Sequence, residues 1–187
     1  SLSSKIGLIN KPIGLDIEKH IDVDKRIIFK KINAVKYLKD NKKSFDLILI
    51  KQTIHFFNNK EIEKILKYTY LSLNSKGIIL ILSLDPKNNE IPVFSLMKKK
   101  LKESFKRENL IKKSILRIMK KKITKKFYFK VTISKKRYFK MIKMRYISLL
   151  LNLTNNQISK GIKEIDLKYK NKIIFNDKLN CLMFRKE

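Results

Sequence analysis

The sequence contains few of the residues that cross-link a chain or favour turns, namely cysteine, glycine and proline. Its 187 residues include one cysteine, four glycines and three prolines. Because one cysteine cannot form an internal disulfide, the fold depends on an apolar core, and 43% hydrophobic residues suffice for one domain over residues 1–187. A secretory signal and an apolar run of membrane-spanning length are also lacking. A reducing cytoplasm is the compartment that fits these absences.

Acidic residues are scarce as well: 46 lysines and arginines stand against 16 acidic residues, a net charge of +30. Such a charge is typical of proteins that bind nucleic acid or an anionic membrane. Lysines outnumber arginines 40 to six, however, and alanine occurs once, which indicates an AT-rich coding sequence. Codon bias leaves the uneven distribution unexplained, since residues 98–143 hold 20 basic and two acidic residues, +18 in total. This segment is predicted to be either a solvated basic face or a patch that meets an anionic partner.

Several signatures of chemistry are missing from the sequence. It has no cluster of metal ligands at the usual spacing, no nucleophile elbow and no phosphate-binding loop. These absences argue against a metal centre, a serine hydrolase and a P-loop nucleotide hydrolase.

The strongest fold signal lies between Phe45 and Asp85. Two apolar runs, Phe45–Ile50 and Ile78–Leu84, are separated by a segment with the periodicity of an amphipathic helix. A strand, a helix and a second strand in this order form the unit that a parallel sheet requires. Ligands bind such sheets beyond the carboxyl ends of the strands, which places a ligand edge at residues 51–55 and 83–85.

Periodicity and capping signals predict the remaining elements. A capping box at Asn58 and Glu61 begins the helix between the two strands, and another at Thr154 and Gln157 begins a later helix. Further strands are predicted at 11–17, 26–32 and 127–134, with one or two more over 172–184 around a turn at 176–178. Further helices are predicted at 1–10, 35–40 and 137–151, with one or two over 95–122. The sequence therefore predicts an α/β fold with a mostly parallel sheet flanked by helices.

Taken in order, these segments resemble a class I S-adenosylmethionine-dependent methyltransferase along nearly the whole chain. The resemblance implies a Rossmann-like sheet with an antiparallel last strand and helical insertions in the C-terminal half. It also implies a cofactor-binding part in residues 1–94, a basic helical substrate cover in 95–170 around the strand 127–134, and a closing strand in 171–187. S-adenosylmethionine would be the cofactor, and methyl transfer the activity.

The resemblance assigns nucleoside contacts to two strand ends. Asp16 and Ile17 match the end of the family's second strand, where a carboxylate binds the ribose hydroxyls, and one carboxylate can accept from two vicinal hydroxyls. Asn33 and Ala34 match the end of the third strand, where an acidic residue usually reads the adenine amino group. The Asn33 amide oxygen can accept the same hydrogen bond with less charge.

The end of the fourth strand would supply the remaining contacts. Lys51 and Gln52 match the cofactor's methionine end, and His55 is the candidate general base because imidazole titrates near neutrality. The alternative for His55 is a plain position at a helix start. Arg145 and Tyr146 lie in a segment that resembles an Arg-aromatic-x-Ser substrate cover, while a surface arginine and a packed tyrosine are the alternative.

One family element has no counterpart in the sequence. The first strand and its glycine-rich loop are missing, and residues 1–9 resemble the helix that follows that loop. We expect an amino-terminal truncation, a sheet without its central strand, and impaired cofactor binding by this chain.

Three functions are consistent with these patterns. The sequence favours methyl transfer to a small-molecule acceptor, because the fourth strand lacks the Asn-Pro-Pro-Tyr type of ending found in many nucleic-acid base methyltransferases. The alternatives are an RNA methyltransferase and a noncatalytic nucleic-acid-binding module, both using the basic segment 98–143. Salt-dependent binding of RNA would favour these alternatives.

Overall fold

The computed structural model describes residues 7–19, 23–85, 88–119 and 122–187. Its strands form a two-stranded sheet of β1 (Ile13–Asp16) and β2 (Ile28–Lys31), and a four-stranded sheet in the order β3 (Phe45–Lys51), β4 (Leu73–Leu84), β6 (Lys172–Arg185), β5 (Lys122–Ser134). The helices are α2 (Ala34–Asp40), α3 (Asn59–Ser72), α4 (Ser95–Ile118), α5 (Lys135–Lys143) and α6 (Asn155–Asp166), with short 3-10 helices η1 (Ile54–Phe56) and η2 (Ser148–Leu150).

Strand direction follows the predicted α/β pattern. β1 pairs with β2 and β3 with β4 in parallel, whereas β6 is antiparallel to both β4 and β5. The prediction of parallel strands closed by an antiparallel pair is therefore confirmed. Among the described residues no strand joins β1 to β3, and the two sheets are separate.

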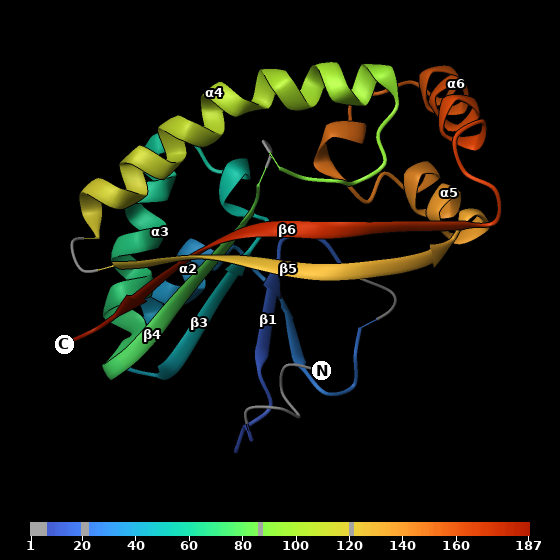
Figure 1. Cartoon of the computed structure of the whole chain (residues 1–187). Coiled ribbons are helices and arrows are strands. Elements are labelled where there is room, and N and C mark those ends of the chain that lie inside the picture. The colour runs from blue at the N-terminus through green and yellow to red at the C-terminus, as the bar shows by residue number, and fades with distance from the viewer. Residues whose placement is uncertain (1–6, 20–22, 86–87, 120–121) are drawn as a thin grey trace.

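Apolar side chains are buried in two clusters. One joins α2, α3 and the C-terminal half of α4 to the four-stranded sheet, and includes Ile65, Ile79 and Ile115. The other joins the start of α4 to α5, α6 and the first part of β6, and includes Met97 and Ile165. Figure 1 shows α4 running along the β5–β6 ribbon, with α3 at one end and α5 and α6 at the other. The long helix α4 thus connects the two clusters.

The predicted helix starts are confirmed in detail. The Asn58 side chain accepts from the Glu61 amide at 3.0 Å, and the Glu61 carboxylate accepts from the Asn58 amide at 2.8 Å. Thr154 and Gln157 make the same reciprocal pair at the start of α6. These contacts satisfy two amides that would otherwise lack intrahelical partners.

The prediction of one helix over 137–151 is wrong, because α5 ends at Lys143. Arg145 adopts a left-handed conformation with φ of 53°, and the Tyr146 amide donates to the Met141 carbonyl at 3.2 Å. This is the hydrogen-bond pattern of a Schellman helix end, which usually has glycine at the left-handed position. Because arginine and not glycine occupies this position, the sequence carries no signal that the helix ends here.

The predicted turn at 176–178 is also wrong, since β6 runs through it as one strand. The polar side chains that suggested a turn are used by the loop after β4. The Glu90 carboxylate accepts from the Asn176 amide at 3.1 Å and pairs with Lys178, while Asn89 donates to Asp177 at 3.4 Å. Polar residues in mid-strand are tolerated here because the loop satisfies them.

Two smaller differences concern element ends. β5 begins at Lys122, five residues before the predicted start at Phe127. Residues 7–10 are not helical, while residues 1–6 of the predicted first helix, and His20, lie outside the described residues.

Candidate active site

A large cavity opens beyond the carboxyl ends of β3 and β4, at the predicted ligand edge. Its volume is about 730 Å³. Much of its wall is apolar, with contributions from four elements: Leu101 of α4, Ile133 of β5, Met141 of α5 and Phe175 of β6. A partly open cavity of this size, with mainly apolar walls and several polar groups, is typical of small-molecule sites.

His55 lies in the wall of this cavity. It belongs to η1, directly after β3, and its Nε2 atom is 3.1 Å from the Ser148 Oγ of η2. Burial, and then the nearby Arg107 cation, lower the pKa of His55 from 6.5. The imidazole is therefore neutral at neutral pH and can accept a proton there.

Two tyrosines from different segments meet in the same wall. The Tyr138 hydroxyl donates to the Pro92 carbonyl at 2.6 Å, and the Tyr138 and Tyr146 rings meet edge to face at 6.2 Å. Burial raises the pKa of both phenols. Both are therefore uncharged at neutral pH and act only as hydrogen-bonding groups.

The predicted substrate pair Arg145 and Tyr146 is separated by the structure. Tyr146 lines the cavity, whereas Arg145 is not among its lining residues. The Arg145 guanidinium donates to the Leu153 carbonyl at 3.1 Å and to the Asn155 side chain at 2.8 Å. Arg145 therefore braces the segment that carries Tyr146 and Ser148.

Asp16 and Asn33 lie together at the carboxyl edge of the small sheet. The Ile32 amide donates to the Asp16 carbonyl at 2.8 Å, and the Asp16 carboxylate accepts from the Glu18 amide at 3.0 Å. The Asn33 amide oxygen caps α2, accepting from the Val35 and Lys36 amides at 2.9 and 3.2 Å. That oxygen is thus already engaged, and the Asn33 side chain presents its NH₂ group as a donor.

The other four predicted residues differ in what they contribute. Gln52 lines the cavity; it has φ of 53° and its amide donates to the Leu82 carbonyl at 2.7 Å. Lys51 is exposed at the end of β3 and does not line the cavity. Ile17 is 61% exposed beside Asp16, and Ala34 packs against the core at the start of α2.

Asp85, at the second predicted ligand edge, is committed to the fold. It is 5% exposed and accepts from the Asn88 side chain at 3.1 Å, with the Lys126 ammonium at 3.4 Å. Burial would raise the pKa of this carboxyl, but the contacts with Asn88 and Lys126 outweigh burial and lower it. The Asp85 carboxylate therefore links the end of β4 to β5 through its ion pair with Lys126.

Sequence reasoning missed several polar groups of the cavity, among them Arg107, Asp177 and Ser148. Arg107 is one cation among many on α4, and Asp177 lies in the segment mistaken for a turn. Ser148 lies in the Arg-aromatic-x-Ser segment, which was a usable signal. Arg107 and Asp177 line the cavity because the fold brings them there, and the sequence around them carries no signal for it.

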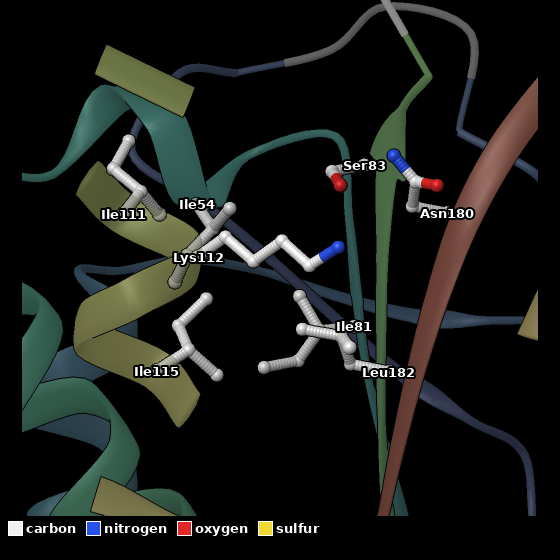
Figure 2. Close-up of a pocket in the computed structure, with 8 residues that line it drawn as sticks. All are labelled: Ile54, Ile81, Ser83, Ile111, Lys112, Ile115, Asn180 and Leu182. Carbon is white, nitrogen blue, oxygen red and sulfur yellow. The ribbon is translucent and has the colours of Figure 1, made fainter. Parts of the chain in front are cut away.

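A second, much smaller cavity of about 20 Å³ lies beneath α4. Figure 2 shows Ile115 of α4 facing Ile81 and Leu182 of the sheet, with Ile111 near Ile54 and the Lys112 side chain extending across toward Ser83. This space admits roughly one water molecule, so it is a packing gap and not a ligand site.

The described residues hold neither a metal-ligand cluster nor a membrane-spanning helix. No group of three or more histidine, cysteine, aspartate or glutamate side chains is arranged to hold a metal ion there. None of the helices in that part of the chain combines the length and apolar character needed to cross a membrane.

Comparison with known proteins gives matches among solved structures alone. No family model matches the sequence, and no curated protein does. An S-adenosylmethionine-dependent methyltransferase from Archaeoglobus fulgidus is 15% identical, with 99% of this chain and 79% of that chain covered and a TM-score of 0.50. Phosphoethanolamine N-methyltransferase 2 of Haemonchus contortus, solved with S-adenosyl-L-methionine, is 15% identical at a TM-score of 0.49. That match covers 99% of this chain and 45% of the Haemonchus chain.

The Archaeoglobus match and the strand order together establish the fold. The four-stranded sheet with its antiparallel closing pair, and the parallel pair β1–β2 beside α2, agree with the predicted architecture. The chain has the fold of the class I S-adenosylmethionine-dependent methyltransferases.

Proposed function

We propose that this protein transfers a methyl group from S-adenosylmethionine to a small-molecule acceptor bound in the 730 Å³ cavity. The observation that carries the proposal is the neutral His55, placed directly after β3 with its Nε2 at 3.1 Å from Ser148 inside that cavity. A base at the carboxyl end of a parallel strand, in a mainly apolar pocket, suits a reaction that requires alignment and removal of one proton.

The residues at the edge of the small sheet suit the adenosine part of the cofactor. Asp16 offers a carboxylate for hydroxyl groups, and the Asn33 NH₂ offers a donor to a ring nitrogen of the base. Ile17 and Ala34 would flank the base, with Lys51 and Gln52 toward the methionine end. Among the described residues no glycine-rich loop stands between β1 and β3, so we expect weak cofactor binding by this chain.

The residues of the chain have separate tasks in the reaction. The cofactor, when bound, supplies a methyl group on a positively charged sulfur, which is already activated for displacement. His55 takes the proton that the acceptor loses as its oxygen or nitrogen forms the new bond to the methyl carbon. Ser148 orients the imidazole, and Tyr146 offers a neutral hydrogen-bonding group to the acceptor.

The test is a transfer assay with tritium-labelled S-adenosylmethionine and a panel of phenols, amines and carboxylic acids, with total RNA included as an acceptor. We expect label in a small molecule, and a loss of about 100-fold in rate for His55→Gln. The matched control, Asp40→Asn on the exposed end of α2, should keep the wild-type rate. Label in RNA alone would contradict the small-molecule acceptor, and an unchanged rate for His55→Gln would contradict the base.

A further inference from the structure

The strand β5 carries a patch of aromatic and basic side chains that the proposed reaction does not use. Every residue from 123 to 130 is exposed, including three consecutive aromatic residues. Phe127, Tyr128 and Phe129 are 52%, 57% and 59% exposed. None of the three lines the large cavity, which begins further along β5 at Val131. Three rings in a row on an edge strand are unusual, because exposed apolar edges invite aggregation.

Positive charge surrounds these rings. Lys125 and Lys130 lie on the same stretch of β5, together with Lys126, which pairs with Asp85. The Lys178 ammonium of β6, which pairs with Glu90, lies 5.9 Å from the centre of the Tyr128 ring. The wider segment 98–143 carries +18 of the total charge of +30. A second copy of this chain is thus a poor partner for the patch, since like charges repel, and a polyanion is a good one.

The arrangement of the rings selects among polyanions. Side chains alternate along a strand, so Phe127 and Phe129 share one face about 6.7 Å apart, and Tyr128 lies on the other. Exposed aromatic rings beside lysines suit a single-stranded nucleic acid, because its unstacked bases stack on the rings while the lysines neutralise its phosphates. A duplex hides its base faces, and a membrane surface cannot take up rings that point to both sides of one strand.

We propose that residues 123–130 of β5 form a binding site for single-stranded nucleic acid. The rings contribute stacking, which is insensitive to sequence, and the lysines contribute salt-dependent affinity. The site is distinct from the cavity that contains His55, and it does not depend on the proposed methyl transfer.

The first experiment measures binding of a fluorescein-labelled single-stranded RNA of about 20 nucleotides and of the matching duplex by fluorescence anisotropy. We expect tighter binding of the single strand, with affinity that falls between about 50 and 200 mM salt. Equal or tighter binding of the duplex would overturn the proposal, because the rings would then contribute nothing.

Matched variants separate the rings from the charge. Replacing residues 127, 128 and 129 together by leucine keeps apolar area and strand propensity but removes the stacking surface, so affinity for the single strand should fall at least about tenfold. The control is Tyr70→Leu on α3, an exposed tyrosine that also has a lysine, Lys186, 5.1 Å from its ring centre. It should leave the affinity unchanged, and circular dichroism checks that each variant is folded.

The lysine variants remove the same charge from two places. Lys125→Gln with Lys130→Gln should reduce the slope of log affinity against log salt by about 1.4, since each contact with a single strand contributes about 0.7. Lys60→Gln with Lys64→Gln on the exposed face of α3 should reduce it much less. Equal effects of the two pairs would overturn a local site in favour of a diffuse effect of net charge.

Vesicles of phosphatidylserine and phosphatidylcholine test the competing partner. We expect a variant with serine at residues 127, 128 and 129 to bind vesicles as the wild type does, because none of the three rings enters the membrane and the lysines that attract anionic lipid remain. If the variant lost vesicle binding and kept RNA binding, the patch would be a membrane contact and the proposal would be wrong.

Discussion

At the scale of single residues, His55 is the group whose charge the surrounding structure controls. Burial and the nearby Arg107 both favour the neutral ring, and they lower its pKa from 6.5. The neutral form thus predominates in the folded state above this lowered value. Protonation costs more in the folded than in the unfolded chain, so stability is full above about pH 6.5 and declines as the pH falls through the lowered pKa.

This leads to a prediction for the His55 titration, followed by the imidazole NMR signal with His20→Gln as the assignment variant. The His55 pKa should lie below 6.5, and Arg107→Gln should raise it by removing the cation without removing burial. The rate of methyl transfer should rise with pH through the same value and then stay level. A His55 pKa at or above 6.5, or one that Arg107→Gln leaves unchanged, would contradict this.

Thr69 is a second residue whose surroundings are informative. It is fully buried on α3, and its hydroxyl has no hydrogen-bond partner within the described part of the chain. Thr69→Val replaces the hydroxyl by a methyl group of similar size, so we expect it to raise the free energy of unfolding in urea by about 1 kcal/mol. Thr69→Ser keeps the hydroxyl and leaves a gap, and should lower it. A loss of stability in Thr69→Val would show that the hydroxyl has a partner.

At the scale of elements, the contact between α6 and the segment before α4 depends on one glycine. A Cβ atom at Gly161 would lie 2.4 Å from the ring of Phe94, which is itself 1% exposed. Overpacking of this kind costs about 1–3 kcal/mol, partly offset by the higher helix propensity of alanine, about 1 kcal/mol.

Gly161→Ala should therefore lower the free energy of unfolding by up to about 2 kcal/mol in urea. Ser159→Ala on the exposed side of the same helix changes propensity alone and should leave stability equal or slightly higher. If both variants were equally stable, the close approach of Phe94 to α6 would be wrong.

Local signals predicted most elements and failed where tertiary contacts decide. The capping boxes and apolar runs gave α3, α6, β3 and β4 because each signal is contained in a few neighbouring residues. The end of α5 was missed because Arg145 occupies the position where glycine would mark a stop. The continuity of β6 was missed because the partners of Asn176 and Lys178 lie almost 90 residues earlier.

The candidate site was predictable to the same extent. His55 and Gln52 follow an apolar strand, so their place at a ligand edge could be read from the sequence. Arg107 and Asp177 could not, since the sequence around them reads as helix surface and as turn. The role of the Asn33 oxygen was misjudged because a helix cap uses that oxygen.

At the scale of the whole molecule, the proposed cofactor site is divided between two sheets. Asp16 and Asn33 lie on the small sheet, whereas Gln52 and His55 lie on the large one, and no described strand connects them. A ligand with a nucleoside at one end and an amino acid at the other would bridge the two groups. Binding of such a ligand is therefore the central claim.

The most direct test is titration with S-adenosylhomocysteine, followed by the backbone amide NMR signals, which detect weak binding. We predict that the signals of Asp16, Asn33, Gln52 and His55 move together along one binding curve, while that of Tyr70 on α3 stays in place. Inorganic pyrophosphate serves as the control ligand, because it offers negative charge to a basic protein without a nucleoside or an amino acid. Shifts confined to one sheet, or the same shifts with both ligands, would contradict a methyltransferase cofactor site.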